Sequence, residues 1–473
     1  MAEEKPLSKQ TKKKGFDFWR NTLKSARYVV APMVDQSELA WRMLSRRYGA
    51  ELCYTPMFHA GMFIRDPIYR SEMMQTCVGD RPLIVQFCAN DPEVFVQAAL
   101  LVESECDGVD LNLGCPQHIA KRGHYGAFLQ DEWELLEKMV KLAHEKLSVP
   151  ITCKIRVFDD VQKTIAYAKM LESAGCQLLT VHGRTREQKR ELTGLADWDQ
   201  IKAVRENLNI PVFANGNIQY LSDVTRCLEY TGCNGVMTAE GNLSNPALFT
   251  GSQPYVWSMA NEYLELATKH KASLSAVRAH LFRLWHKSLN MHTDIRTQMG
   301  EAKSIDDVRR CSETLERRVK EDMETNKTPE TECGLAYWCC QPYVRNHNNS
   351  RKRPFSDENG VSKQSDEEVT KKISNRQKKK ALKRQKKEAQ GSRVWVFCTS
   401  EKCENPGGQK CVSSLCRECC RQKSSTETLD CPAHRLWFKK KSIPRDAQVS
   451  DELQKTVPST DNKQEESAIE ADY

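Results

Sequence analysis

The chain has 473 residues, a formal net charge of +8 and 20 cysteines. This length exceeds the ~100–200 residues of a typical domain, although single barrels reach ~250, so we expect one large domain with smaller additions. The N-terminus carries no apolar signal segment, and no run approaches the ~20 apolar residues of a membrane span. These features exclude a small secreted disulfide scaffold. We expect a reducing compartment, cytoplasmic or nuclear, and no membrane partner.

Residues 1–20 are polar and charged, and we expect them to form a disordered N-terminus. From Tyr28 onwards, short apolar runs alternate with amphipathic segments, as in parallel strands that are buried on both faces and joined by helices. Eight such runs follow one another, at 28–33, 51–57, 82–87, 108–114, 150–157, 178–183, 211–216 and 235–241.

Eight strands with helical crossovers form either a closed barrel or a doubly wound open sheet. The count of eight favours the barrel. So does the absence of a GxGxxG motif after the first run, where a dinucleotide-binding fold would carry it. We therefore predict an α/β fold with a (β/α)₈ TIM barrel over residues 21–254.

The pattern changes after the barrel. Residues 255–345 are helical in pattern and predict a small all-α domain, with the aromatic segment 335–345 packing back as an ordered end. Residues 346–392 are poor in apolar side chains and include ten Lys or Arg between Lys371 and Lys387, which predicts a basic disordered linker. The remainder divides into a Cys-rich segment, 393–440, and a disordered tail, 441–473.

The most specific motif is DLNLGCPQ at 110–117, because barrel enzymes carry their chemistry at the carboxyl ends of the strands. Gly114 and Pro116 constrain the backbone around Cys115 and could hold its thiol at the barrel mouth. An ordinary thiol titrates at about 8.5, so it is protonated at neutral pH and suited to donating a proton. A lowered pKa would make it a nucleophile instead, and a buried structural cysteine is the third interpretation.

Two pairs of polar side chains share faces on neighbouring strands. Lys154 and Arg156 alternate in the fifth run, as His182 and Arg184 do in the sixth. A barrel interior cannot bury two cations without an anionic partner, so we expect either a ligand with negative charge or salt bridges to adjacent strands. His182 could hold a phosphate, a ribityl hydroxyl or a flavin edge, or be an ordinary core histidine.

The last two strands end in ANGN, 214–217, and AEGN, 239–242, where barrels often bind phosphate through backbone N–H groups. Gly216 and Gly241 permit close approach of an anion, although tight turns also explain them. Gln86, at the end of the third run, can donate and accept at the edge of a heterocycle. No carboxylate pair or His/Asp metal cluster stands at the strand ends, so a phosphorylated planar cofactor such as FMN is the simplest answer.

Over residues 25–320 the chain resembles the tRNA-dihydrouridine synthases, and most of all the eukaryotic branch that acts on D-loop uridines of the 16/17 type. The motifs that carry the resemblance are APM at 31–33, LNLGCPQ at 111–117, KIR at 154–156, HGRTR at 182–186, ANGN at 214–217 and GVMTAEGN at 235–242. The resemblance implies FMN in the barrel, NADPH or NADH as hydride donor, and a helical domain that grips tRNA, the partner whose D-arm carries the target. We expect a monomer.

The family's functional residues can be carried over position by position. Cys115 would protonate C5 of the uracil while hydride reaches C6, and Asn112 and Arg184 would touch the substrate. Many bacterial members have Arg where this chain has Glu240, and we expect that carboxylate to turn away from the phosphate. The residues that would contact FMN are Pro32, Met33, Val34, Gln86, Lys154, His182, Asn215, Gly216, Asn217, Ala239 and Glu240.

The Cys-rich segment has the spacings C-x₄-C, C-x₂-C and C-x₂-H, which are near those of structural zinc sites. Eight ligands could hold one or two ions, and one of two adjacent cysteines could be structural instead. A disordered, oxidation-prone tail is the alternative to zinc, and the nearby basic tract could contact tRNA phosphates or direct nuclear import. The candidate ligands are Cys398, Cys403, Cys411, Cys416, Cys419, Cys420, Cys431 and His434.

Three functions compete at this point. The first is an FMN-dependent reductase of tRNA uridine, with the target base extruded into the pocket. The second is an FMN oxidoreductase of a small pyrimidine or quinone, which would need neither a helical domain nor a basic tract. The third is a non-catalytic RNA-binding protein on a barrel scaffold, which the intact set of pocket residues disfavours.

Overall fold

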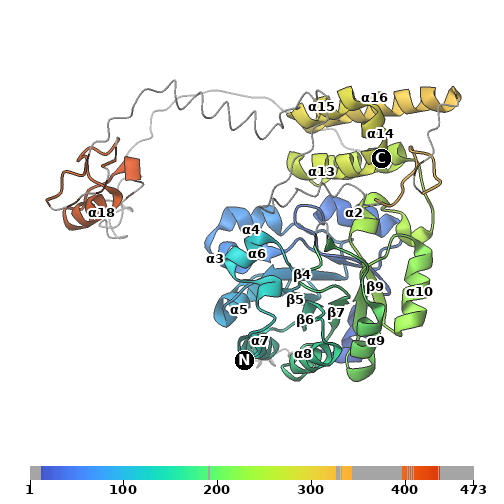
Figure 1. Cartoon of the computed structure of the whole chain (residues 1–473), viewed down its shortest axis with the longest axis horizontal. Helices are drawn as coiled ribbons and strands as arrows, with labels where there is room; N and C mark the ends of the chain where they lie inside the picture. The colour runs from blue at the N-terminus through green and yellow to red at the C-terminus, as the bar shows by residue number, and fades with distance from the viewer. Residues whose placement is uncertain are drawn as a thin grey trace, which may run out of the picture. The chain divides into compact units, whose positions relative to one another are not determined.

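The computed structural model describes residues 12–189, 192–325, 331, 333–343, 397–401, 403, 405, 407–408, 410–434 and 436. They fall into two compact units, one within Met1–Pro354 and one within Phe355–Tyr473 (Figure 1). The predicted linker 346–392 and tail 441–473 lie outside the described residues. No helix in the described part of the chain combines the length and the apolar character needed to cross a membrane.

The first unit is built on a closed parallel barrel. Its sheet runs in the order β2-β1-β9-β8-β7-β6-β5-β4, and pairing of β2 with β4 closes the ring. The eight predicted runs all form barrel strands, so the prediction of a (β/α)₈ barrel is confirmed; β3 is a short additional strand beside β4. The strands are β1 (Tyr28–Val30), β2 (Leu52–Tyr54), β3 (Phe58–His59), β4 (Leu83–Cys88), β5 (Gly108–Leu113), β6 (Ile151–Arg156), β7 (Leu179–His182), β8 (Val212–Asn215) and β9 (Gly235–Thr238).

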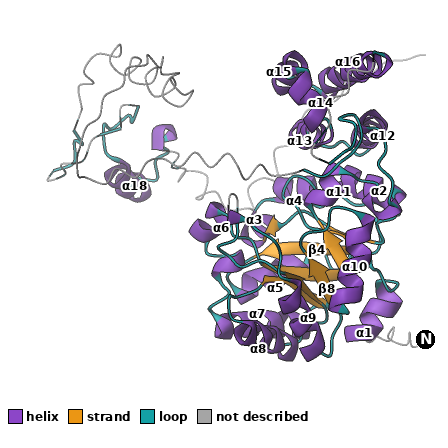
Figure 2. Ribbon diagram, turned by 45° about the vertical axis from the view of Figure 1, so that its right-hand side comes forward, coloured by secondary structure: helices purple, strands orange, loops and turns teal. Residues whose placement is uncertain are grey.

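Helices surround the barrel (Figure 2). Asp91, Asp160 and Asp197 cap three of them, each accepting a backbone N–H of the first turn. The helices are α2 (Leu39–Arg47), α3 (Ala60–Arg65), α4 (Pro67–Met73), α5 (Pro92–Leu100), α6 (His118–Gly123), α7 (Trp133–Lys146), α8 (Val161–Ser173), α9 (Trp198–Asn207), α10 (Leu221–Thr231) and α11 (Glu240–Ser244).

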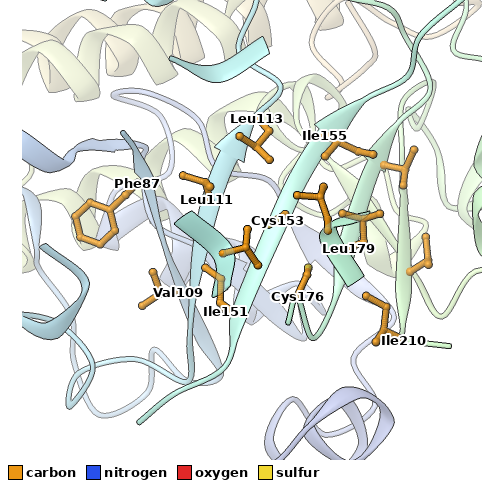
Figure 3. Close-up of a cluster of buried hydrophobic side chains, with 14 of the residues drawn as sticks. Phe87, Val109, Leu111, Leu113, Ile151, Cys153, Ile155, Cys176, Leu179 and Ile210 are labelled. Atoms are coloured by element: carbon orange, nitrogen blue, oxygen red, sulfur yellow. The ribbon is translucent and has the colours of Figure 1, made fainter. Parts of the chain in front are cut away.

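Strand alternation gives the barrel an apolar outer face, and an inner face that is polar near the carboxyl ends of the strands. Val109, Leu111 and Leu113 of β5 belong to the cluster that packs between strands and helices (Figure 3). Successive side chains of a strand point to opposite faces, so Asp110 and Asn112 of the same strand point into the barrel. The strand is buried on both faces, and its inward positions are polar.

The N-terminal segment packs against the barrel, which corrects the prediction that residues 1–20 are disordered. Residues 1–11 lie outside the described residues, but Gly15–Asp17 forms α1 and Phe18–Thr22 a π-helical turn. Phe18 is fully buried and packs in one cluster with Ile84 and Met237 from two strands. The aromatic side chain anchors the segment, because burying a Phe outweighs the polarity of its neighbours.

Among the described residues of the first unit, five helices follow the barrel and pack on it through α2. Trp41 of α2 stacks on His280 at a centroid distance of 3.9 Å. The Glu38 carboxylate accepts hydrogen bonds from the Tyr263 hydroxyl at 2.8 Å and pairs with Nε2 of His280 at 2.9 Å. The helices are α12 (Val256–Lys269), α13 (Leu274–Leu284), α14 (His286–Met291), α15 (Thr293–Glu301) and α16 (Ile305–Glu324).

The aromatic segment near the end of this unit packs back, as predicted from its sequence. Tyr337, Trp338 and Cys340 are buried among the helices. The Cys340 N–H donates to the Pro254 carbonyl at 2.9 Å, which ties the segment to the start of the helical region. Residues 344 and 345 lie outside the described residues.

Candidate active site and Cys-rich module

A chain of hydrogen bonds crosses the barrel interior from Thr152 to Asn112. Thr152 Oγ1 donates to one oxygen of Asp110 at 2.6 Å, and Gln86 Nε2 donates to the other at 2.8 Å. Asn112 Nδ2 in turn donates to Gln86 Oε1 at 2.8 Å. Because the Asp110 carboxylate accepts only, it fixes the orientation of the Gln86 amide, and that amide fixes the orientation of Asn112.

This chain ends on the loop that carries Cys115. Asn112 Oδ1 accepts the backbone N–H groups of Gly114 at 3.2 Å and Cys115 at 3.0 Å. The Cys115 carbonyl accepts from the Ala127 N–H at 3.1 Å. Gly126, with φ of +67°, packs so close that an added Cβ would lie 2.9 Å from that carbonyl oxygen. The backbone of Cys115 is therefore held on both sides.

Cys115 is partly buried after the end of β5 and packs against the small cluster that contains Cys88 and Tyr125. Burial raises its pKa, while a backbone hydrogen bond from Gln117 and the charges of Arg156 and Lys154 oppose that rise. The thiol is thus protonated at neutral pH, which suits an acid and disfavours the nucleophile alternative. Cys115 as a residue is partly buried, not fully enclosed in the core.

Arg156 binds backbone carbonyls of two loops, whereas the sequence predicted either an anionic ligand or a salt bridge for it. Its Nε donates to the Gly114 carbonyl at 2.8 Å and its Nη1 to the Thr185 carbonyl at 2.7 Å and to the Gln188 carbonyl at 3.1 Å. A guanidinium has five N–H donors in a rigid fork, so it can join several carbonyls at once. Arg156 thereby connects the Cys115 loop with the loop after β7.

Lys154 lies beside Asn215, whose Oδ1 accepts from its Nζ at 2.9 Å. The residue is partly buried, and the salt bridges of the described residues give its amine no carboxylate partner. Burial and the nearby Arg156 lower its pKa to about 8, whereas Asp110 raises it. A cation in this setting can be stabilised by an anionic ligand.

His182 and Arg184 lie together, as their shared face predicts. Arg184 Nη1 is 3.1 Å from His182 Nε2, and Arg184 Nη2 donates to Asn217 Oδ1 at 2.7 Å. Because arginine only donates, Nε2 accepts and Nδ1 carries the ring proton. Burial, then the charges of Lys154 and the two arginines nearby, hold the pKa of His182 well below its usual value, so the ring is neutral.

The two glycines of the expected phosphate loops are required by packing within the protein. Gly216 has φ of +119°, and an added Cβ would lie 2.6 Å from Cβ of Ala196. An added Cβ at Gly241 would lie 2.2 Å from the Ile218 carbonyl oxygen. Close packing within the protein therefore requires both glycines, and contact with a phosphate stays a prediction.

The remaining predicted flavin residues lie at the ends of β1, β4 and β9. Pro32 and Met33 are partly exposed, and the Met33 N–H donates to Ser37 Oγ at 3.0 Å. Gln86 is fully buried, with both ends of its amide bonded within the protein. The others are Val34, which is exposed, Ala239, which is partly exposed, and Glu240, which is exposed.

Replacing Lys154 by Met should stabilise the flavin-free protein near pH 7. With a folded-state pKa near 8, the amine is charged in both folded and unfolded states below that pH, so the full penalty for burying the charge is present. Between about 8 and 10.5 the unfolded chain binds more protons, so wild-type stability rises with pH and the advantage of Lys154→Met shrinks. Urea unfolding at pH 7 and pH 9.5 measures the free energy of unfolding of the wild type and the variant. The same difference between the two proteins at both pH values would contradict the prediction.

The sequence missed two residues that organise this site. Asp110 stands two positions before Asn112, and the period of a strand could have placed both on the inward face. Gly126 lies in a loop without a motif, and its contact with Cys115 depends on two segments that meet only in the fold.

The predicted metal ligands separate into two groups in the second unit. The ligand atoms of each group lie within 4.8 Å of one another. The adjacent Cys419 and Cys420 join different groups, so neither is left over as a purely structural residue. One group is Cys398, Cys403, Cys416 and Cys419; the other is Cys411, Cys420, Cys431 and His434.

A closed barrel with a polar interior and a protonated thiol at the carboxyl end of a strand defines a (β/α)₈-barrel enzyme. The sequence profile of the family described as Dihydrouridine synthase (Dus) matches residues 29–334, and the chain belongs to that family.

Relatives cover most of the chain. A mouse protein (Mus musculus) named tRNA-dihydrouridine(16/17) synthase (NAD(P)(+))-like is 55% identical over 444 residues, covering 91% of this chain and 92% of its own. A Saccharomyces cerevisiae tRNA-dihydrouridine(16/17) synthase is 47% identical over 351 residues, which cover 67% of this chain and 83% of the yeast protein. A mouse tRNA-dihydrouridine(20a/20b) synthase-like protein is 41% identical over 247 residues, which cover 51% of this chain and 75% of that protein.

Proposed function

We propose that this chain is a tRNA-dihydrouridine(16/17) synthase, which reduces D-loop uridine to 5,6-dihydrouridine with FMN and NAD(P)H. One observation carries the proposal: Cys115, a partly buried residue with a protonated thiol, follows the carboxyl end of β5 on a loop held from both sides. The 16/17-type relatives in mouse and yeast support the choice of substrate.

The residues around the mouth fit FMN. Lys154 is a cation without a carboxylate partner among the described salt bridges, and it suits the edge of a flavin where negative charge gathers on reduction. His182 is neutral, with its proton on Nδ1, and can donate a hydrogen bond without adding charge. Pro32 and Met33 provide an apolar wall. When bound, FMN supplies the hydride that reduces the uracil ring.

Cys115 holds the proton that the reduced ring requires at C5. Its raised pKa keeps that proton in place until the ring carbon becomes basic, so the acid is ready without a separate activating base. Arg156 keeps the Cys115 loop at a fixed distance from the loop after β7. Asn112 and Arg184 are the candidates for contact with the base or its phosphates, and Asn112 in addition holds the loop.

The partner is tRNA. A base inside a folded D-loop must leave its stack to reach a thiol within a barrel mouth, so we expect the target uridine to be extruded. The helical region α12–α16 is fixed to the barrel by Trp41 and Glu38, which gives a rigid second surface for the rest of the tRNA.

The proposal is tested with purified protein and unmodified tRNA. We expect a yellow protein that, with NADPH, forms dihydrouridine at positions 16 and 17, detected by mass spectrometry of nuclease fragments. Equal activity on free uridine would favour a small-molecule oxidoreductase. A colourless protein that binds tRNA without changing it would favour the non-catalytic alternative.

Replacing Asp110 by Leu should lower the rate of dihydrouridine formation by up to about 100-fold, because a small displacement of a reacting group can have an effect of that size. The Leu side chain cannot accept from Gln86, so the amides of Gln86 and Asn112 lose their fixed orientation. Asp110→Asn keeps one acceptor oxygen and should retain most of the rate. Equal loss in both variants, or loss that parallels the melting temperature, would contradict a positioning role.

A further inference from the structure

The Cys-rich module, defined as residues 397–436, has almost no apolar core. Its buried cluster consists of five cysteines and Leu415. Units of only ~40 residues usually need disulfides, a metal or a partner to fold, because they bury too little apolar surface. All the cysteines are free thiols. The thiols are therefore the groups in this cluster through which the module could gain the stability that its small apolar core does not provide.

The spacing of the sulfurs matches the edges of a metal tetrahedron. Sγ of Cys403 and Sγ of Cys416 are 3.8 Å apart, and Sγ of Cys411 lies 3.6 Å from that of Cys420 and 3.9 Å from that of Cys431. Zinc–sulfur bonds of about 2.3 Å place tetrahedral sulfurs about 3.8 Å apart. A disulfide joins only two sulfurs, at about 2.0 Å, whereas Cys411 has two sulfur neighbours.

His434 is oriented as a ligand of the second group. Its Nδ1 lies 3.6 Å from Sγ of Cys431, close to the sulfur–nitrogen edge of about 3.5 Å expected from zinc bonds of about 2.3 and 2.0 Å. The opposite edge of the ring packs on Gly408, where an added Cβ would lie 2.5 Å from Nε2. The glycine leaves room for the ring in the orientation that turns Nδ1 toward the sulfurs.

Backbone N–H groups also converge on the sulfurs. The Cys416 N–H donates to Sγ of Cys398 at 3.1 Å, and the Cys419 N–H donates to Sγ of Cys416 at 3.5 Å. Such donors stabilise sulfur best when it is a thiolate, and outer hydrogen bonds of this kind orient metal ligands. Cys416 also caps α18 (Arg417–Thr426), so the helix begins at the site.

We propose that the Cys-rich module binds two structural zinc ions, one through four cysteines and the other through three cysteines and Nδ1 of His434. The ligands interleave along the chain: Cys411 of the second site stands between Cys403 and Cys416 of the first. One loop of each site thus carries ligands of the other. All four positions of each ion are filled by protein, so neither ion has an open position for catalysis.

The test measures zinc in the full-length protein, purified in a reducing buffer without strong chelators, by elemental analysis and native mass spectrometry. Two zinc ions per chain are expected. Cys398→Ser and His434→Ala should each lower the count to one or fewer, while His434→Cys, which restores a fourth thiolate, should keep two. Cys77→Ser, a half-buried cysteine of the barrel unit, is the matched control and should also keep two.

Fewer than two ions in the wild-type chain, or two ions retained by both Cys398→Ser and His434→Ala, would overturn the proposal. So would wild-type thiols found as disulfides by mass. The readout is metal content, so a chain that bound two zinc ions but formed no dihydrouridine would support this inference while contradicting the proposed function.

Discussion

Cys115→Ala is expected to lower the rate of dihydrouridine formation by ~10²–10⁴-fold, the range that a positioned acid contributes. The thiol is the one protonated acid that the structure fixes on the motif loop, through Asn112 on one side and Ala127 on the other. Alanine removes the proton and leaves the backbone unchanged. The measurement is single-turnover formation of dihydrouridine in tRNA, with flavin content and tRNA affinity recorded for the same samples.

Cys77→Ala provides the control, since this cysteine contacts Met43 and lies outside the proposed site. The pH dependence gives a second check. Burial raises the pKa of Cys115, so the acid form persists above the ordinary thiol range, and the rate should fall only as pH rises through that elevated value. If Cys115→Ala keeps the wild-type rate, the assignment of the proton donor is wrong.

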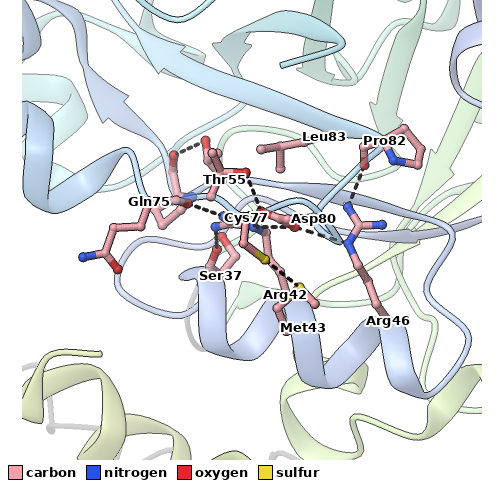
Figure 4. Close-up of polar contacts among 12 residues, drawn as sticks. Ser37, Arg42, Met43, Arg46, Thr55, Gln75, Cys77, Asp80, Pro82 and Leu83 are labelled. Carbon is pink, nitrogen blue, oxygen red and sulfur yellow. Dashed lines mark hydrogen bonds and ion pairs between the residues drawn. The ribbon is translucent and has the colours of Figure 1, made fainter. Parts of the chain in front are cut away.

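Asp80→Ala should lower the free energy of unfolding by about 3–5 kcal/mol, because it leaves a buried guanidinium without its partner. Arg42 and Asp80 are 1% and 0% exposed, and their closest atoms are 2.6 Å apart (Figure 4). Arg46 pairs with the same carboxylate at 3.2 Å. Arg42 also donates to the Ser37 carbonyl at 2.7 Å, and Ser37 in turn holds Met33, so flavin affinity should fall with stability.

Two comparisons isolate this effect in urea unfolding. Glu321→Ala breaks the exposed pair with Arg317 and should change stability by only about 0.3–0.5 kcal/mol. Replacing both partners, as Arg42→Met with Asp80→Leu, removes the unpaired charge and should recover much of the loss. If Asp80→Ala lowers the free energy of unfolding by less than about 1 kcal/mol, the pair contributes no more than an ordinary surface salt bridge and the prediction is wrong.

The barrel was predictable because its signal is local and repeated. Each of the eight runs is apolar enough to be buried on both faces, and the count restricted the topology to very few folds. The N-terminal segment was mispredicted for the opposite reason. Its average composition is polar, and the contribution of Phe18 depends on the cluster with Ile84 and Met237, residues distant in sequence.

The site was only partly predictable. The motif around Cys115 identified the candidate acid, and alternation placed Lys154 and His182 on inward faces. Arg156 was expected to meet a ligand or a carboxylate, yet its partners are three backbone carbonyls. Which carbonyls lie within reach of a guanidinium depends on how loops end in space, and strand periodicity carries no information about that.

The sequence by itself determined the barrel, the candidate acid Cys115 at a strand end and the eight candidate ligands of the Cys-rich module, because these follow from residue type and short-range spacing. Only the tertiary structure decided the hydrogen-bond chain from Asp110 to Cys115, the packing that requires Gly126, and the division of the ligands into two groups of four. Each of these depends on distances between residues that are separated along the chain and meet only when it folds.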